Sequence, residues 1–185
     1  IWPALLMALD LPLPKKVFGH GWLIIDGGKI SKSLGNYKDP REYINLYGVD
    51  AIRYFALREV PFGNDGNFSE LSLINRTNAD LANVLGNLVN RTISMSKKYF
   101  DGVVINQNVN DTIDDDLINT ATELHKLVDE KMNELHISDA LDLIFDLLRK
   151  CNKYIDDTTP WILAKEGKYT YKLPIPSSII SVTYI

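Results

Sequence analysis

The sequence predicts a mainly α-helical chain in which a short region of strands, turns and small helices precedes a bundle of three long helices. Two observations support this prediction. In the second half of the chain, apolar residues recur every three or four positions in three separate segments, which is the spacing of one buried helix face. In the first 70 residues, by contrast, prolines and glycines divide the chain into short pieces. With 45% hydrophobic and 24% charged residues, the 185-residue chain can bury a core and keep a polar surface.

Short elements are expected in the first 40 residues. Trp2–Leu9 (WPALLMAL) is predicted to be a helix that opens near Pro3, and the prolines of Leu11–Lys16 (LPLPKK) require an extended connector. Val17–Ile25 (VFGHGWLII) is a predicted strand. Asp26–Gly28 is a predicted turn, because aspartate and glycine tolerate positive backbone angles. The polar stretch DGGKISKSLGN, which begins in this turn, is therefore expected to leave the end of a strand.

Two short helices are predicted next. Asp39 can cap the first of them, with Pro40 at its first position, and Asp50 can cap the second. Pro61–Asn67 (PFGNDGN) has the composition of a loop.

The three long helices begin near Leu71, and each has one apolar stripe. Short polar linkers join them, which favours an antiparallel bundle. Ser138 or Asp139 can cap the third helix. The stripes are formed by Ile74, Leu81, Leu85, Leu88 and Met95 in the first helix, by Leu117, Ala121, Leu124 and Val128 in the second, and by Leu141, Ile144, Leu148, Cys151 and Ile155 in the third.

The composition limits the partners and the compartment. The formal net charge is -4, so the whole chain offers no basic field to nucleic acid, and any such site must be local. The one cysteine, Cys151, cannot form an internal disulfide, and no cysteine and histidine cluster has the spacing of a zinc site. We therefore expect a reducing, cytoplasmic compartment and no metal ligands in this chain. The apolar runs are too short to span a bilayer and no targeting signal opens the sequence, so we expect no membrane contact.

The stretch DGGKISKSLGN has the residue types of a phosphate-binding loop. Its glycines permit backbone movement, Lys29 and Lys32 bring positive charge, and Ser31 and Ser33 bring short donors suited to phosphate oxygens. The same residues are also typical of a solvated surface turn, and local composition alone favours that simpler interpretation.

This stretch resembles the K-M-S-K-S signature of the class I aminoacyl-tRNA synthetases, with Ile30 in the place of the methionine. The flanking sequence, from Ile1 to about Lys168, resembles the bacterial methionyl type, whereas the leucyl, isoleucyl, valyl and cysteinyl types share the signature but have different flanks. The resemblance implies that residues 1–40 are the end of a Rossmann-like α/β catalytic domain, that residues 41–70 connect it to the next domain and contact the tRNA stem, and that residues 71–168 form an α-helical anticodon-binding domain.

The same resemblance implies a reaction and a role for the loop. Methionine and ATP, with Mg²⁺, would form an adenylate, and the aminoacyl group would then pass to tRNA(Met). Lys32, assisted by Lys29, would bind ATP and stabilise the charge that develops on its phosphates. Ile30 would keep the apolar anchor of the signature, and Ser31 and Ser33 would shape the loop or contact phosphate.

His20 and Gly21, just before the turn, would lie near the adenine of ATP by the same resemblance. A histidine in a strand is more often simply packed. Gly19 and Gly21 nevertheless suggest a close approach of another backbone.

The resemblance also identifies residues that would read the anticodon. Asn87 and Arg91 are four residues apart, so they share one helix face beside the leucine stripe and are expected to be free to reach a ligand. Thr159 can cap a further short helix that begins at Pro160, which places Trp161 in the first turn, where its ring could stack on an unpaired base. The alternatives are a solvated helix face and a tryptophan buried in the bundle. Lysines that could meet tRNA phosphates are Lys97, Lys98, Lys165 and Lys168.

Both ends of the sequence suggest part of a longer protein. Ile1 lies inside an apolar run with no helix cap before it, so we expect a truncation there. The segment 169–185 has two prolines and a β-branched run that cannot continue the bundle; it is either an extended tail or not native coding sequence, and we expect the second. The resemblance places the methionine pocket, a zinc-bearing insertion and the editing region outside this chain, so the chain alone is expected to be inactive.

Two other interpretations remain open from the sequence. One is a class I synthetase of the leucine, valine or isoleucine type. The other is a helical tRNA-binding module without catalysis. The sequence predicts no oligomeric state.

Overall fold

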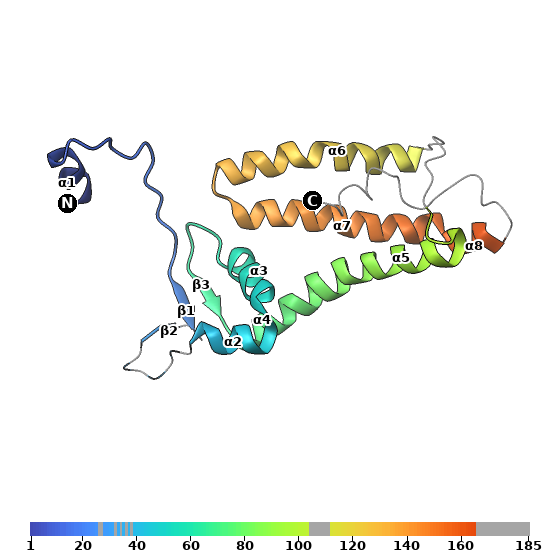
Figure 1. Ribbon diagram of the computed structural model, residues 1–185, viewed down its shortest axis with the longest axis horizontal. Helices are drawn as coiled ribbons and strands as arrows, with labels where there is room; N and C mark the ends of the chain where they lie inside the picture. The colour runs from blue at the N-terminus through green and yellow to red at the C-terminus, as the bar shows by residue number, and fades with distance from the viewer. Residues whose placement is uncertain are drawn as a thin grey trace.

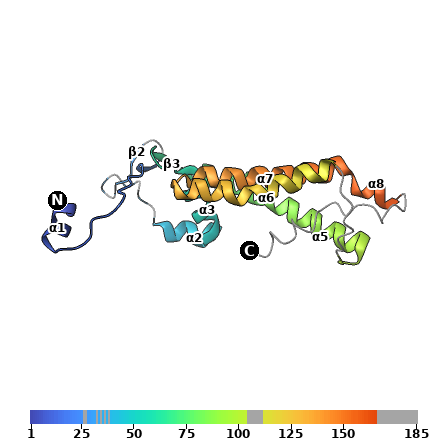
Figure 2. The same ribbon diagram turned by 90° about the horizontal axis from the view of Figure 1, so that it is seen from above.

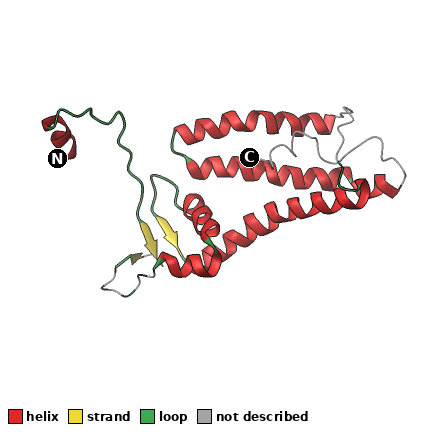
Figure 3. Cartoon of the chain, in the orientation of Figure 1, coloured by secondary structure: helices red, strands yellow, loops and turns green. Residues whose placement is uncertain are grey.

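The computed structural model describes residues 1–25, 28–31, 33, 35, 37, 39–103 and 112–165. The molecule is elongated, with α1 at one end, a small sheet with short helices next to it, and long helices that extend to the other end (Figure 1). Coloured by secondary structure, the chain is largely helical with one small sheet (Figure 3). The predicted mainly α-helical class is confirmed at this level.

The first helix, α1 (Trp2–Ala8), has its proline near the start, as predicted, and none of its residues is buried. The segment that follows is extended, also as predicted. It carries α1 away from the rest of the molecule in both views (Figures 1 and 2). The apolar side chains of this region therefore lie open on the surface; they include Trp2, Leu5, Met7, Leu9 and Leu11, each at least half exposed.

The sheet has three short strands in the order β2-β1-β3. The central strand β1 (Leu23–Ile25) pairs antiparallel with β2 (Gly28–Lys29) and parallel with β3 (Gly66–Phe68). The predicted strand Val17–Ile25 was too long, because β3 offers partners to its last three residues only. Gly28, predicted as a turn residue, belongs to β2.

The strand β3 lies partly inside the predicted loop Pro61–Asn67. Its sequence, Gly-Asn-Phe, has no alternation of apolar and polar residues, so only its pairing with β1 reveals it. At the head of this pairing the Gly66 N–H donates to the carbonyl of Trp22 at 2.9 Å.

Two helices lie between β2 and β3 along the chain, almost entirely within the connecting segment, which we define as residues 41–70. In α2 (Pro40–Tyr47) the cap prediction is confirmed, because the Asp39 carboxylate accepts a hydrogen bond from the Arg41 N–H at 2.9 Å. The prediction that Asp50 caps α3 (Val49–Glu59) was wrong. The chain enters this helix through Gly48 at a φ of +83°, so Asp50 falls within its first turn.

A small core joins the connecting segment to the next helix. Its buried residues are Tyr43, Phe55 and Leu73, with Phe68 of β3 packed against them. The Phe68 ring meets those of Tyr43 and Phe55 edge to face, at centroid distances of 4.8 and 5.4 Å.

One continuous helical rod leads from this small core into the bundle (Figure 1). It consists of α4 (Glu70–Arg76), the π-helical stretch η1 (Thr77–Gly86) and α5 (Asn87–Phe100). The i→i+5 hydrogen bonds of η1 wind the chain more loosely than an α-helix, so a stripe spaced for an α-helix does not stay on one side. Leu73, outside the predicted stripe, is fully buried, whereas Leu85 within it is 37% exposed.

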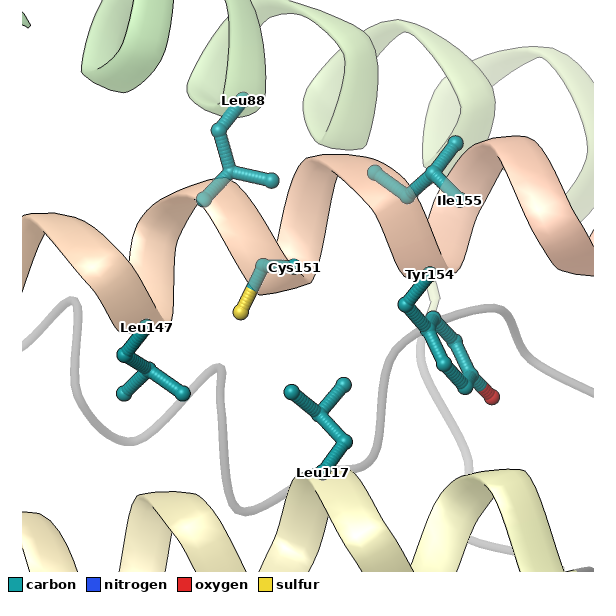
Figure 4. Packing of buried hydrophobic residues seen from close by; sticks show 6 residues of the cluster. All are labelled: Leu88, Leu117, Leu147, Cys151, Tyr154 and Ile155. Atoms are coloured by element: carbon teal, nitrogen blue, oxygen red, sulfur yellow. The ribbon is translucent and has the colours of Figure 1, made fainter.

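The bundle is completed by α6 (Thr112–Asn133) and α7 (Ile137–Thr158), with the short α8 (Pro160–Lys165) at its far end. The helix α7 lies between α5 and α6, and all three contribute to one core (Figure 4). From above, α6 and α7 run side by side while α5 diverges from them (Figure 2). The core residues are Leu88, Leu117, Leu147, Cys151, Tyr154 and Ile155.

The start of α7 differs from the prediction. Its cap position is His136, whose side chain makes no capping hydrogen bond, so neither Ser138 nor Asp139 caps the helix. The Ser138 hydroxyl instead donates to the backbone carbonyl of Arg58 at 2.8 Å, which ties α7 to α3. The segment 169–185 lies outside the described residues.

Candidate functional site

The polar stretch after β2 places several predicted phosphate-binding groups close together. Lys29 ends β2 and is exposed, and its Nζ lies 5.9 Å from the centroid of the Trp22 ring. Ile30 and Ser31 are half-buried, and the Ser31 and Ser33 hydroxyls are 2.7 Å apart. Lys32 lies outside the described residues. The described part of this loop thus contains a cation and a pair of hydroxyls within five consecutive positions of the chain.

His20 and Gly21 precede β1 rather than belonging to it, so the expectation that they lie on a strand was wrong. His20 is exposed and its Nδ1–H donates to the carbonyl of Gly21 at 2.8 Å. A Cβ atom at Gly21 would overlap the backbone of Asn64, which confirms the predicted close approach. Gly19 has open space around it, so the same prediction was wrong there.

At the other end of the molecule, Asn87 and Arg91 lie on the first turns of α5, and Asn87 is exposed. The expectation that Arg91 has no partner within the protein was wrong. Its guanidinium forms an ion pair with Asp156 of α7, and its Nη1 donates to Asn152 Oδ1 at 3.4 Å. The Arg91 side chain nevertheless remains 31% exposed.

Asn152 and Asp156 were not identified from the sequence. They are four residues apart on α7, so they share a helix face, and this spacing was the available signal. The Asn152 amide also donates to the backbone carbonyl of Val84, a residue of η1, at 3.0 Å. The pair therefore fixes the Arg91 side chain and the end of η1 against α7.

Pro160 and Trp161 open α8, as predicted. Thr159 adopts a φ of +40° at the end of α7, and its carbonyl accepts a hydrogen bond from the Ile162 N–H at 2.9 Å. Pro160 is buried, while Trp161 is half-buried and packs against the bundle core. Trp161 is thus neither fully buried in the bundle nor fully exposed, and its stacking on a base stays a prediction.

The predicted phosphate-contacting lysines are surface residues where they are described. Lys97 and Lys98 lie in the last turn of α5, with the Lys98 Nζ 5.2 Å from the centroid of the Tyr99 ring, and Lys165 ends α8. All three are exposed. Lys168 lies outside the described residues.

A cluster of charged residues joins α3, α4, η1 and α7. No sequence pattern had indicated this cluster. At its centre the buried carboxylate of Asp80 accepts a hydrogen bond from the Tyr54 hydroxyl at 2.6 Å and from Arg76 Nη1 at 3.3 Å. Burial, together with this hydrogen bond to Asp80, raises the pKa of Tyr54 well above its ordinary value. The hydroxyl therefore stays protonated and continues to donate to Asp80 at any physiological pH.

Within residues 1–25, 28–31, 33, 35, 37, 39–103 and 112–165, no group of three or more histidine, cysteine, aspartate or glutamate side chains could hold a metal ion. In the same ranges, no helix has the length and apolar character needed to cross a membrane.

A family model described as tRNA synthetases class I (M) matches residues 1–93. The methionine--tRNA ligase of Caldanaerobacter subterraneus is 62% identical over 166 residues, which are 90% of this chain and 26% of that protein. The methionine--tRNA ligase of Clostridium acetobutylicum is 55% identical over 165 residues, with 89% of this chain and 26% of that protein covered. The chain thus spans about a quarter of the length of these relatives.

Solved structures of methionyl-tRNA synthetases are also similar to this chain. The Mycobacterium tuberculosis methionyl-tRNA synthetase in complex with methionyl-adenylate matches with a TM-score of 0.85 and 42% identity, over 91% of this chain and 34% of that one. The apo form of the same enzyme matches with a TM-score of 0.79 and 37% identity, over the same shares of the two chains. These relatives are methionine enzymes, which does not favour a synthetase of the leucine, valine or isoleucine type.

Proposed function

The chain belongs to the class I tRNA synthetases of the methionine type, and we propose that it supplies two parts of a methionine--tRNA ligase. The first is the loop that meets the phosphates of ATP. The second is the helical surface that reads the anticodon of tRNA(Met). The neighbour with bound methionyl-adenylate supports the use of ATP and methionine in this family.

In the first part, Lys29 and the hydroxyls of Ser31 and Ser33 would contact phosphate oxygens, with Lys32 completing the set. Cations and hydroxyl donors stabilise the charge that develops as pyrophosphate leaves, most strongly where water is excluded. Removal of one such contact typically lowers the rate about 100- to 1000-fold. ATP would arrive with Mg²⁺ as part of the substrate, and His20 and Gly21 would lie toward its adenine.

In the second part, the anticodon-reading surface would consist of Asn87 and Arg91 on α5 with Pro160 and Trp161 on α8. The half-buried Trp161 would serve as a stacking platform, and stacking on an aromatic ring contributes about 1 to 3 kcal/mol per base. Amide and guanidinium groups can form hydrogen bonds with base edges in an unpaired loop.

The observation on which this proposal rests is the arrangement at the far end of the bundle. Arg91 is held by Asp156 while its side chain stays 31% exposed, and the half-buried Trp161 lies in the first turn of α8. A fixed guanidinium and a partly packed aromatic ring suit recognition of unpaired bases, because both are planar and already oriented before binding.

The test is binding of the chain to anticodon stem-loops at a fixed salt concentration. We expect the stem-loop with CAU to bind about 5- to 150-fold more tightly than stem-loops with one changed anticodon base, because one lost base contact costs about 1 to 3 kcal/mol. Equal affinity for all stem-loops would refute the proposal. The chain alone is expected to form no methionyl-adenylate, since its loop would act together with parts of the family's fold that lie outside this sequence.

A further inference from the structure

Arg58 joins three helical elements where the connecting segment meets the bundle. It lies in the last turn of α3, and its side chain is only 13% exposed. Its guanidinium forms an ion pair with Asp142 of α7, and its Nη1 also donates to the Ser138 hydroxyl at 3.1 Å. The Ser138 hydroxyl donates in turn to the Arg58 carbonyl. Both the side chain and the backbone of Arg58 are thus tied to the start of α7.

The opposite edge of the guanidinium faces the buried carboxylate of Asp80. Arg58 Nε lies 3.9 Å from Asp80 Oδ2, which is too long for a hydrogen bond, and in the described part of the chain this buried Nε has no other hydrogen-bond partner. Asp80 itself is held by Tyr54 and Arg76. Arg58 therefore lies between a fixed carboxylate on η1 and a second carboxylate on α7.

These contacts suit orientation better than stability. Asp142 is 46% exposed, so solvent screens its ion pair with Arg58 and the pair contributes little to the free energy of unfolding. Its hydrogen bonds are directional, however, and a guanidinium has a fixed planar geometry. Another contact between side chains of α3 and α7 is the Tyr54–Phe145 ring pair, at 5.2 Å and 47°, and ring pairs allow more than one geometry.

We propose that Arg58, through Asp142 and Ser138, is a positioning residue that sets the orientation of the helical bundle relative to the connecting segment and the sheet. The consequence for binding rests on the proposed function. One tRNA would touch the bundle with its anticodon and the connecting segment with the inner side of its body. If the two surfaces are held in one orientation, the second contact forms at a high effective concentration once the first has formed.

The orientation can be measured without any RNA. Spin labels on cysteines introduced at Asn45 of α2 and Glu123 of α6, both exposed, report the distance between the connecting segment and the bundle. Cys151 need not be replaced, because it is buried. We compare the unsubstituted pair with Asp142→Asn and Ser138→Ala, which remove the two contacts from the α7 side.

Two further variants serve as controls. Asp142→Glu keeps the charge, and Asp146→Asn removes an equivalent charge one turn later on α7, where Asp146 forms an exposed pair with Arg149. We expect a narrow distance distribution for the parent protein and both controls, and a broader or shifted one for Asp142→Asn and Ser138→Ala. Asp142→Asn removes the ion-pair partner of the largely buried Arg58, which keeps its hydrogen bond to Ser138 and lies 3.9 Å from the Asp80 carboxylate. Distributions as narrow in Asp142→Asn as in Asp146→Asn would overturn the proposal.

Binding to RNA tests the consequence for tRNA. For Asp142→Asn we expect unchanged affinity for the isolated CAU stem-loop and a loss of about tenfold in affinity for whole tRNA(Met). A parallel loss of both affinities would indicate a merely structural role and overturn the positioning role, as would an unchanged affinity for whole tRNA. If the parent protein binds neither RNA, the proposed function fails, whereas the distance measurement still decides whether Arg58 sets the orientation.

Discussion

Arg91 permits a prediction in which stability and RNA binding separate. Its ion pair with Asp156 lies at the surface, where the Arg91 side chain is 31% exposed and that of Asp156 is 61% exposed. Solvent screens such a pair, so it contributes no more than about 1 kcal/mol to folding. Arg91→Ala should therefore lower the free energy of unfolding by about 1 kcal/mol or less, as measured by urea denaturation.

The effect on RNA binding should be larger. If Arg91 contacts a base, its loss costs about 1 to 3 kcal/mol, which raises Kd for the CAU stem-loop about 5- to 150-fold. Fluorescence anisotropy at constant salt measures this change. The matched control is Arg149→Ala, because Arg149 also forms an exposed pair on the bundle surface, with Asp146. Equal Kd values for the two variants would show that Arg91 makes no contact of its own with the RNA, and the reasoning would be wrong.

Three further predictions concern the fold. Leu117→Ala should lower the free energy of unfolding by about 2 to 5 kcal/mol, because Leu117 is fully buried between α6 and α7. Leu127→Ala, on the exposed side of α6, should change it by less than about 0.5 kcal/mol, and urea denaturation measures both values. Burial raises the pKa of the Cys151 thiol to about 11, so a thiol reagent at pH 8 should modify it only after denaturant is added, and immediate modification would contradict the packing. Hydrogen bonds from Arg41 lower the pKa of the Asp39 carboxyl below its ordinary value. The cap of α2 should therefore stabilise the fold at pH values above the unfolded-state pKa of Asp39, and this stabilisation should be lost as the pH falls through the folded-state pKa. An NMR titration should show that Arg41→Gln raises the Asp39 pKa again.

The buried residues of a helix were predicted more accurately when the helix packs against neighbours on one side only. The helix α6 meets the bundle on one side, and its predicted stripe of Leu117, Ala121 and Leu124 is the face that packs. The helix α7 has neighbours on two sides, so it also buries Leu147 and Tyr154, which lie outside its predicted stripe. A periodicity of 3.6 residues identifies one face, and it cannot identify a second.

Buried polar residues were the other main gap. Aspartate and arginine are usually exposed, so there was no reason from the sequence to place Asp80 and Arg58 in the interior. Only the fold brings them together with Tyr54 and Arg76. At the candidate site, local motifs identified the loop and the start of α8, because caps and prolines act over a few residues. The partner of Arg91 is 65 residues away in the sequence, so no local pattern could indicate it.

The rod formed by α4, η1 and α5 has a consequence for how this chain can vary in length. Its first part buries Leu73 in the small core, and its last part buries Leu88 in the bundle core. Each residue of an α-helix turns the chain by about 100°, and each residue of the more loosely wound η1 by less, so one residue inserted between these leucines would still rotate one core relative to the other. The number of residues between the two cores is therefore constrained by the winding of the helix.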